Sequence, residues 1–247
     1  MPEQTSKNIT ADETVDLDPA EYGSIIFFTG AGMSAECGVP TYRGAGGIWE
    51  SYNWEEVACQ RAFEQDPEKV LDFHELRRAG LFNCRPHAGH EIIARLQRQH
   101  SDTRIVTQNI DGMHQRAGTI DVLELHGNIW RLRCKDHGTF EDYGKSYTRR
   151  HCPQCGKWLR PDITWFEDML DPAVLAEMGS LMKNVNLFIA VGTSGLVYPA
   201  AIFPQLAQQV GARTVCINTE EPDDASFYDD IIMGRASEIL TRLFNTR

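Results

Sequence analysis

Short runs of apolar residues alternate with amphipathic helical stretches along most of the chain. Five runs have the length and composition of buried strands: Ser24–Thr29, Arg104–Thr107, Val122–Leu125, Asn186–Val191 and Thr214–Asn218. Three stretches have the apolar spacing of helices: Ala88–Gln97, Tyr198–Val210 and Arg235–Phe244. The second of these is expected to carry Pro199 in its first turn and to end before Gly211. Strands that are apolar on both faces and alternate with helices predict an α/β fold with a parallel sheet covered on both sides.

Two stretches break this alternation. Trp54–Leu81 is helical in character but has no strand pattern, and Arg131–Arg160 is rich in cysteine, histidine, glycine and charge. We interpret both as insertions into the sheet domain. Met1–Ala20 is polar and acidic without any periodicity, so we expect it to be a mobile tail.

Polar or glycine-rich segments follow every predicted strand. In chain order they read TGAG, QNIDG, HGN, GTS and TEE. Each segment alone is compatible with an ordinary surface turn. The carboxyl ends of parallel strands meet at one edge of the sheet, where the ligands of open parallel sheets bind. Five such ends together favour a binding crevice at that edge.

The loop after the first strand matches the G-x-G-x-x-A dinucleotide pattern at Gly30, Gly32 and Ala35. Glycines at these positions let the backbone approach a pyrophosphate closely, and the N–H groups that follow can donate hydrogen bonds to it. The pattern on its own is weak support for a dinucleotide site.

The chain after this loop departs from the usual dinucleotide fold, because Pro40 interrupts the expected helix. Glu50 has nearly the spacing of a ribose-binding acid, but that acid normally follows an unbroken helix and a second strand. We therefore reject Glu50 in that role. We interpret Pro40–Trp49 as a separate, flexible cofactor loop, from which Tyr42 and Arg43 can reach a ligand.

His126 directly follows a predicted strand. A single histidine is more often structural than catalytic. Here Gln108, Asn109 and Asp111 are expected at the neighbouring strand end. An imidazole has an ordinary pKa of about 6.5, so it can act as a general base beside a ribose at neutral pH.

Cys134-x-x-His137 and Cys152-x-x-Cys155 form two ligand pairs. Each pair can turn inward on a tight knuckle, and four nitrogen and sulfur ligands suit tetrahedral zinc. Because no coordination position stays open, the site is expected to be structural. An alternative leaves His137 exposed and supplies the fourth ligand from His151 or water.

The formal net charge of −11 disfavours nucleic acid as the main partner but is compatible with basic protein substrates. The longest apolar runs, such as IIFF, are too short to span a membrane. No N-terminal segment combines a basic start with an apolar core, so we expect no signal peptide and a cytoplasmic protein. Seven cysteines in that setting favour metal binding or free thiols over a disulfide framework.

A set of motifs along the chain resembles one family. In chain order they are GAGMSAECGVPTYRG, TQNIDGMHQRAG, ELHGN, the paired knuckles, RPDITWFED, VGTSGLVYPAA and INTE. Together they resemble the sirtuins, NAD-dependent protein lysine deacylases, over about Ser24 to Leu243. The compact length is similar to that of bacterial members.

The resemblance implies a Rossmann-like parallel sheet domain that carries a small module. The NAD-binding domain would comprise residues 21–53, 82–130 and 161–247. The small module would combine a helical insertion, 54–81, with a zinc ribbon, 131–160. NAD and an acyl-lysine protein or peptide would meet in the cleft between them, zinc would be structural, and the chain would be a monomer.

The resemblance also assigns roles to individual residues. The loop that encloses NAD would be formed by Gly30, Ala31, Gly32, Tyr42, Arg43 and Trp49. The nicotinamide and ribose pocket would be formed by Gln108, Asn109 and Asp111, with His126 as the catalytic base. The adenosine side would be formed by Gly192, Thr193, Ser194, Asn218, Thr219, Glu220 and Ala236. A strand that pairs with the substrate peptide would contain Trp165, Phe166 and Glu167.

The implied reaction begins when the acyl oxygen attacks the ribose C1′ and nicotinamide leaves. His126 then helps to deprotonate a ribose hydroxyl, which attacks the resulting imidate. The products are free lysine and O-acyl-ADP-ribose. This reaction needs a neutral histidine.

Several residues depart from the family pattern. Cys37 stands where serine is usual, Tyr42 replaces a common phenylalanine, and His137 replaces a zinc-binding cysteine. The branch that removes negatively charged acyl groups has a Tyr-x-x-Arg pair and a small alanine. Here the pair reads His74-x-x-Arg77, and the alanine is Ala58.

His74 and Arg77 share one helix face at this spacing, and a buried arginine can pair with a carboxylate. One interpretation is therefore an acidic-acyl pocket, which predicts a desuccinylase or demalonylase as well as a deacetylase. The other is that both are solvated helix residues. Two further functions use the same cofactor crevice: a protein mono-ADP-ribosyltransferase, and a non-catalytic sensor of NAD or ADP-ribose.

Overall fold

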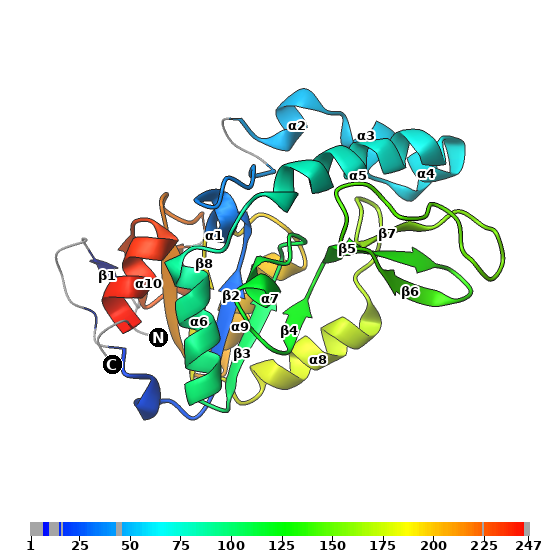
Figure 1. Cartoon of the computed structure of the whole chain (residues 1–247). Coiled ribbons are helices and arrows are strands. Elements are labelled where there is room, and N and C mark those ends of the chain that lie inside the picture. Colours follow the sequence, from blue (N-terminus) through cyan, green and yellow to red (C-terminus); the bar gives the residue numbers. More distant parts are fainter. Residues whose placement is uncertain (1–6, 10–14, 16, 43–45, 224, 245–247) are drawn as a thin grey trace.

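A seven-stranded, fully parallel sheet forms the centre of the larger domain in the computed structural model (Figure 1). The structure describes residues 7–9, 15, 17–42, 46–223 and 225–244. The strand order is β1-β10-β9-β8-β2-β3-β4. In chain order the strands are β1 (Lys7–Ile9), β2 (Ile25–Thr29), β3 (Thr103–Thr107), β4 (Val122–Glu124), β8 (Leu187–Val191), β9 (Arg213–Asn218) and β10 (Asp230–Met233). The predicted α/β class and parallel sheet are confirmed.

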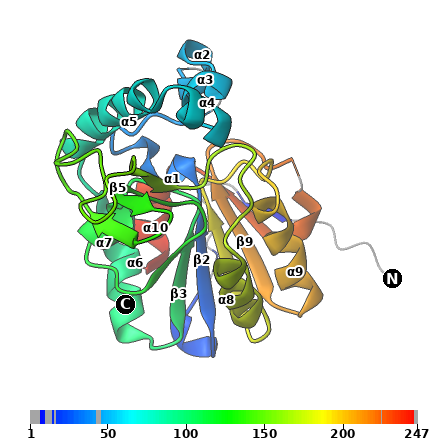
Figure 2. The ribbon, with the colours of Figure 1, turned by 90° about the vertical axis from the view of Figure 1, so that its right-hand side faces the viewer.

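Helices cover both faces of this sheet (Figures 1 and 2). On one face lie α6 (Ala88–Gln99) and α10 (Ala236–Phe244), and on the other lie α8 (Pro172–Met182) and α9 (Phe203–Gln209). Consecutive residues of β2 point to opposite faces, as the pleat requires. The ring centroid of Phe27 lies 6.1 Å from that of Phe244, whereas that of Phe28 lies 5.7 Å from that of Phe203. Burial on both faces explains why these strands are continuously apolar.

The small module lies beyond the carboxyl ends of the central strands (Figures 1 and 2). Its helices are α2 (Ile48–Ser51), α3 (Trp54–Val57), α4 (Gln60–Gln65) and α5 (Pro67–Phe82). Its antiparallel sheet is formed by β5 (Gly127–Cys134), β6 (Gly138–Glu141) and β7 (Arg160–Ile163). One apolar core joins the two parts, so the stretches 54–81 and 131–160 fold against each other. None of the described helices is long and apolar enough to cross a membrane.

The N-terminal stretch differs from the prediction of a tail without structure. Lys7–Ile9 pairs in parallel with β10 and becomes the edge strand of the sheet. Pro19–Glu21 forms a 3₁₀ turn, and Leu17 is buried at 2% exposure. A three-residue strand is too short to produce a periodic signal, and its pairing depends on the distant edge of β10. Residues 1–6, 10–14 and 16 of the predicted tail lie outside the described residues.

The helix predicted over Tyr198–Val210 begins later than expected. Ala200–Ile202 forms a 3₁₀ turn, and α9 starts only at Phe203. Pro204 lacks a backbone N–H, so it is tolerated in the first turn of a helix but not in its interior. The helix therefore starts beside Pro204, and the end before Gly211 is confirmed.

Candidate active site

The ends of the five predicted strands meet at one edge of the sheet, joined by backbone hydrogen bonds. Gly30 N donates to Val191 O at 3.0 Å, and Gln108 N donates to Thr29 O at 2.9 Å. The outer loops continue the series: Leu125 N donates to Thr107 O at 2.9 Å, and Gly192 N donates to Ile217 O at 2.9 Å. The polar segments that follow these strands are therefore fixed relative to one another.

The glycines of the first loop are required by contact with the loop after β8. A Cβ on Gly30 would lie 2.7 Å from Gly192 O, and a Cβ on Gly32 would lie 2.7 Å from the Cα of Gly192. Gly192 has a φ of +61°, and a Cβ there would lie 2.2 Å from Met33 N. The two loops thus pack backbone against backbone, a reason for these glycines that differs from the predicted approach of a pyrophosphate. Gly30 is the N-cap residue of the short helix α1 (Ala31–Ala35).

Amide side chains line the floor between these loops. Asn109 Nδ2 donates to Gly30 O at 2.8 Å and to Ser34 Oγ at 3.3 Å. Gln108 Nε2 donates to Thr193 Oγ1 at 3.0 Å. Asp111 is buried, accepts from Met113 N at 2.8 Å, and has a pKa raised chiefly by burial. The structure therefore brings these three predicted residues together beside the first loop.

The predicted adenosine side continues along the loops after β8 and β9. Asn218 Nδ2 donates to Thr193 O at 3.2 Å, and Asn218 Oδ1 accepts from Thr219 N at 3.0 Å. Ala236 is buried at the start of α10. Of the residues predicted for the adenosine side, three are solvent-exposed: Ser194, Thr219 and Glu220.

His126 lies at the junction of β4 and β5, next to the loop after β3. Its Nδ1 lies 2.8 Å from Gln108 O, so Nδ1 carries the proton and donates to that carbonyl. The Nε2 lone pair is then available as a base. Burial lowers the pKa of His126, and the bond to Gln108 O opposes this shift. The imidazole is therefore neutral at pH 7.

This lowered pKa predicts the acid limb of the pH–activity profile. A general base works only when it is unprotonated, so activity is full above the pKa of His126 and falls as pH drops through it. Because the pKa is lowered from 6.5, the acid-limb midpoint of kcat/KM is expected below pH 6.5. A series of kcat/KM measurements between about pH 5 and 8 tests this. A midpoint at or above 6.5 contradicts the assignment.

Aromatic side chains connect the predicted cofactor loop to the small module. The ring centroid of Trp49 lies 5.9 Å from that of Tyr42, 6.2 Å from Phe73 and 5.3 Å from Phe166. The Arg77 guanidinium lies 5.0 Å from the centre of the Tyr42 ring. Trp49 N donates to Tyr42 O at 3.3 Å, which ties the two ends of the loop. Arg43, also predicted here, lies outside the described residues.

A small cavity joins this loop to the floor of the site. It is lined by Ala31, Val39, Pro40, Tyr42, Arg77, Leu81, Asn109, Ile110 and Asp111. The positive charge of Arg77 helps to lower the pKa of Asp111, against the larger effect of burial. Arg77 therefore faces the cofactor crevice rather than open solvent.

His74 and Arg77 have different surroundings although they share a helix face. His74 is 2% exposed, and its Nε2 accepts from Trp165 Nε1 at 3.1 Å. Burial, reinforced by the charge of Arg77, lowers the pKa of His74 to about 3, so the ring is neutral. Ala58 is also buried, and its carbonyl accepts from Phe166 N at 3.1 Å. Ala58, His74 and Arg77 were predicted to bind the substrate, and of these three residues only Arg77 is charged.

The predicted peptide-pairing strand is not a regular strand. β7 ends at Ile163, and Phe166 forms a single bridge with Cys59. Glu167 has a φ of +72° and faces outward, where it pairs with Arg61 at 3.2 Å. Its left-handed backbone interrupts the extended conformation that a strand needs.

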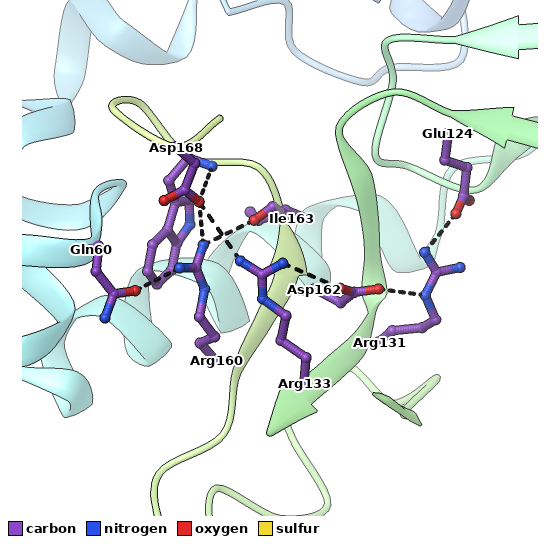
Figure 3. Close-up of polar contacts among 9 residues, drawn as sticks. Gln60, Glu124, Arg131, Arg133, Arg160, Asp162, Ile163 and Asp168 are labelled. Carbon is purple, nitrogen blue, oxygen red and sulfur yellow. Dashed lines mark hydrogen bonds and ion pairs between the residues drawn. The ribbon is translucent and has the colours of Figure 1, made fainter. Parts of the chain in front are cut away.

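A polar network that the sequence analysis missed holds Trp165 in place (Figure 3). Asp168 Oδ2 accepts from Trp165 N at 3.0 Å and from Arg160 Nη2 at 2.6 Å. The Arg160 guanidinium also lies 3.7 Å from the centre of the Trp165 ring and donates to Gln60 at 2.6 Å. Figure 3 shows how the alternating charges continue across the small sheet, through Arg133, Asp162, Arg131 and Glu124. The available signal was Arg160 together with Asp162 and Asp168 in RPDITWFED.

The four predicted zinc ligands are preassembled at the tip of the ribbon. His137 Nδ1 lies 3.5 Å from the Sγ atoms of both Cys134 and Cys152, and Cys134 Sγ lies 3.7 Å from Cys155 Sγ. Separations of this size fit a tetrahedral zinc ion. His151 instead stacks on Trp158 at 4.1 Å and is outside the group. The geometry supports His137, not His151, as the fourth member.

Comparisons with known proteins agree with this architecture. The Sir2 family model matches residues 30–199. An NAD-dependent protein deacylase 2 from Pyrobaculum aerophilum is 44% identical, covering 88% of each chain. A Sir2 homologue solved in complex with NAD is 36% identical with a TM-score of 0.84, covering 92% of this chain and 90% of that one. A Sir2 protein solved with a deacetylated p53 peptide and 3′-O-acetyl-ADP-ribose is 27% identical with a TM-score of 0.82, covering 92% and 94%.

These similarities extend over nearly the whole length of both partners, and they include the sheet domain and the small module. The chain belongs to the Sir2 family.

Proposed function

We propose that this protein is an NAD-dependent protein lysine deacylase that transfers the acyl group to ADP-ribose and releases nicotinamide. The main support for this proposal is the orientation and the neutral state of the His126 ring. Its Nδ1 is fixed by Gln108 O at 2.8 Å, and its neutral Nε2 is available at the meeting point of the sheet edge and the small module. A neutral, oriented imidazole suits removal of a proton from a sugar hydroxyl. The relatives named as deacylases support the same reaction.

The side chains around His126 have complementary tasks in this proposal. NAD supplies an activated bond between ribose and nicotinamide. Asn109 and Asp111 would orient the nicotinamide half, while the packed loops after β2 and β8 would hold the phosphates. Tyr42 and Trp49 shield the reacting sugar carbon from water by closing against Phe166 and Phe73. His126 takes the proton from the ribose hydroxyl that receives the acyl group.

The peptide would bind along the segment after β7. The network of Arg160 and Asp168 fixes Trp165, and the bridge between Phe166 and Cys59 fixes the neighbouring backbone. The backbone up to Phe166 is fixed in this way, although Glu167 interrupts it, and a fixed backbone segment can pair with a substrate peptide through its main chain. This mode of binding depends little on the peptide's side chains.

We further propose that the acyl pocket accepts acidic acyl groups through Arg77 alone. His74 is neutral and bonded to Trp165, so it adds no positive charge. Arg77 lies partly buried between the Tyr42 ring and Asp111, where a guanidinium can pair with a carboxylate. Ala58, whose carbonyl accepts from Phe166 N, has a small side chain at this position.

Arg77→Ala tests this preference. A hydrogen bond to a charged partner contributes about 1.5–3 kcal/mol, so kcat/KM on a succinyl-lysine peptide is expected to fall about 10- to 100-fold. The value on the matched acetyl-lysine peptide is expected to change much less, because acetyl has no carboxylate. Lys69→Ala removes one positive charge from the start of the same helix, where Lys69 pairs with Glu56 at the surface. This control should leave both values unchanged. A wild-type preference for acetyl that survives Arg77→Ala refutes the acidic pocket.

A further inference from the structure

A second group of metal-binding side chains lies behind the first loop, separate from the ribbon. It consists of Cys37, which follows α1, and of His87 and His90 at the start of α6. One potential ligand atom of each lies within 4.8 Å of those of the other two. A thiol and two imidazoles form a donor set that suits zinc. No step of the proposed reaction uses these three residues.

His90 is the most unusual member of the group. Its side chain is 0% exposed, and neither ring nitrogen has a hydrogen-bond partner among the residues the structure describes. Its ring centroid lies 4.3 Å from that of His87 and 5.0 Å from that of His114. Buried polar atoms in proteins nearly always have partners, so an imidazole in this state needs an explanation. Coordination of a metal ion by a ring nitrogen provides one.

His87 connects the group to the first loop. Its Nδ1 accepts from Gly89 N at 3.0 Å, and its Nε2 donates to Met33 O at 2.7 Å. The Glu36 carboxylate lies 4.0 Å from the same Nε2. To coordinate a metal ion, His87 must release one of these two hydrogen bonds.

The charged and titratable groups around Cys37 allow a cation to bind. Asp111 and Glu36 place negative charge near the thiol, and Cys84 is a further neighbour. Burial raises the pKa of Cys37 to about 11, so the group is a thiol until a metal ion displaces its proton. His90 is neutral because burial holds its pKa well below the ordinary value. The group therefore offers neutral imidazole lone pairs and one thiol.

We propose that Cys37, His87 and His90 form a second zinc site, behind the cofactor crevice. On binding, the sulfur–hydrogen bond of Cys37 is replaced by a sulfur–zinc bond and one proton is released. Each histidine coordinates through a ring lone pair, and water completes a tetrahedral shell. No oxidation or reduction takes place. The site is independent of the proposed acyl transfer.

The second site is expected to bind zinc more weakly than the ribbon. In the ribbon the three separations given above are 3.5 to 3.7 Å, close to those of a bound tetrahedral ion. In the second group the ligand atoms lie within 4.8 Å of one another, and both ring nitrogens of His87 already take part in hydrogen bonds. His87 must give up one of these hydrogen bonds to coordinate the ion. The ribbon should therefore fill first as free zinc is raised.

The test is a count of zinc per chain on the full-length protein. Samples are dialysed to equilibrium against buffers of fixed free zinc in the micromolar range, and zinc is measured by mass spectrometry. Wild-type protein is expected to hold two zinc ions per chain, and Cys37→Ser is expected to hold one. Cys84→Ser is the matched control, because Cys84 is a partly exposed cysteine beside Cys37 but outside the group. It is expected to hold two.

His87→Asn separates ligand loss from damage to the fold. Asparagine can accept from Gly89 N and so still cap α6, but it removes the imidazole. This variant is expected to hold one zinc ion and to remain folded, with a melting temperature lowered only by the lost bond to Met33 O. One zinc ion in the wild type overturns the proposal. Two zinc ions in either Cys37→Ser or His87→Asn also overturn it.

Discussion

Replacing His126 with alanine is expected to lower kcat/KM for deacylation by about 10²- to 10⁴-fold, the contribution of a positioned general base. Among the described residues, the imidazole has one hydrogen bond, from Nδ1 to Gln108 O, and it lies at the junction of β4 and β5. Its removal should therefore leave the sheet and the small module intact. Product peptide is measured by mass spectrometry, and folding is followed by thermal melting.

A matched control separates this role from a general effect of losing a histidine. His100 caps the opposite end of α6, and its Nε2 lies 2.8 Å from Tyr22 O, far along the helix from the crevice. His100→Ala should retain nearly full activity even if its melting temperature falls. NAD binding should be retained in the His126 variant. Full deacylation by that variant would remove the chemical basis of the proposed function.

Replacing Cys152 with serine is expected to release the ribbon's zinc ion and to reduce activity to near background. Zinc binding to finger-like sites contributes about 10–16 kcal/mol, and much of this free energy is lost with one ligand. Burial raises the pKa of the Cys152 thiol, but hydrogen bonds from the backbone N–H groups of Gln154 and Cys155 and from the thiols of Cys134 and Cys155 together lower it to about 6, which favours metal binding. Loss of the ion frees the ends of β5 and β6. It also loosens β7, which leads into Trp165.

The measurements for this variant are zinc content, tryptophan fluorescence and limited proteolysis. The ribbon should become protease-sensitive while the sheet domain remains folded. Cys216→Ser is the control, because Cys216 is a buried cysteine of β9 outside both metal-binding groups. It should keep the zinc and the activity. A Cys152→Ser protein with unchanged zinc content and activity would contradict a structural metal at the ribbon.

The main sheet could be predicted from the sequence because its central strands contain unbroken apolar runs, such as IIFF in β2 and LFIAV in β8. Phe27 and Phe28 pack on opposite faces, so no alternation with polar residues was needed to recognise β2. The convergence of the strand ends followed from parallel topology alone. β1 could not be predicted in the same way, because three residues carry no period and their partner is more than 200 residues away in the chain.

The acyl side shows why spacing along a helix is not enough. His74 and Arg77 are three residues apart, and the pattern predicted a shared task for them. His74 accepts a hydrogen bond from Trp165 in the core, whereas the Arg77 guanidinium lies over the Tyr42 ring at the crevice. Both partners come from distant segments, so neither environment could be predicted locally. The role of Arg160 was missed for the same reason, since Asp168, Gln60 and the Trp165 ring meet it only after folding.

The metal-binding residues could be predicted only in part from the sequence. The two knuckles predicted four ligands, but the sequence left His137 and His151 as alternatives. Stacking on Trp158 keeps His151 away from the cysteines, and this contact depends on the fold of the ribbon. His87 and His90 have the spacing of a ligand pair, but nothing in the sequence connects Cys37 to them, because the fold brings the end of α1 and the start of α6 together from separate parts of the chain.

Nicotinamide release over a panel of acyl-lysine peptides tests the central claim most directly. Each reaction contains the protein, NAD and one acetyl, succinyl or unmodified peptide, and free nicotinamide and deacylated peptide are measured together. A deacylase should release nicotinamide only with acylated peptides, in equal amounts with deacylated lysine, and none with the unmodified peptide. NAD binding without any release would indicate a sensor, and release coupled to labelling of protein by ADP-ribose would indicate a transferase. Either result would contradict a deacylase.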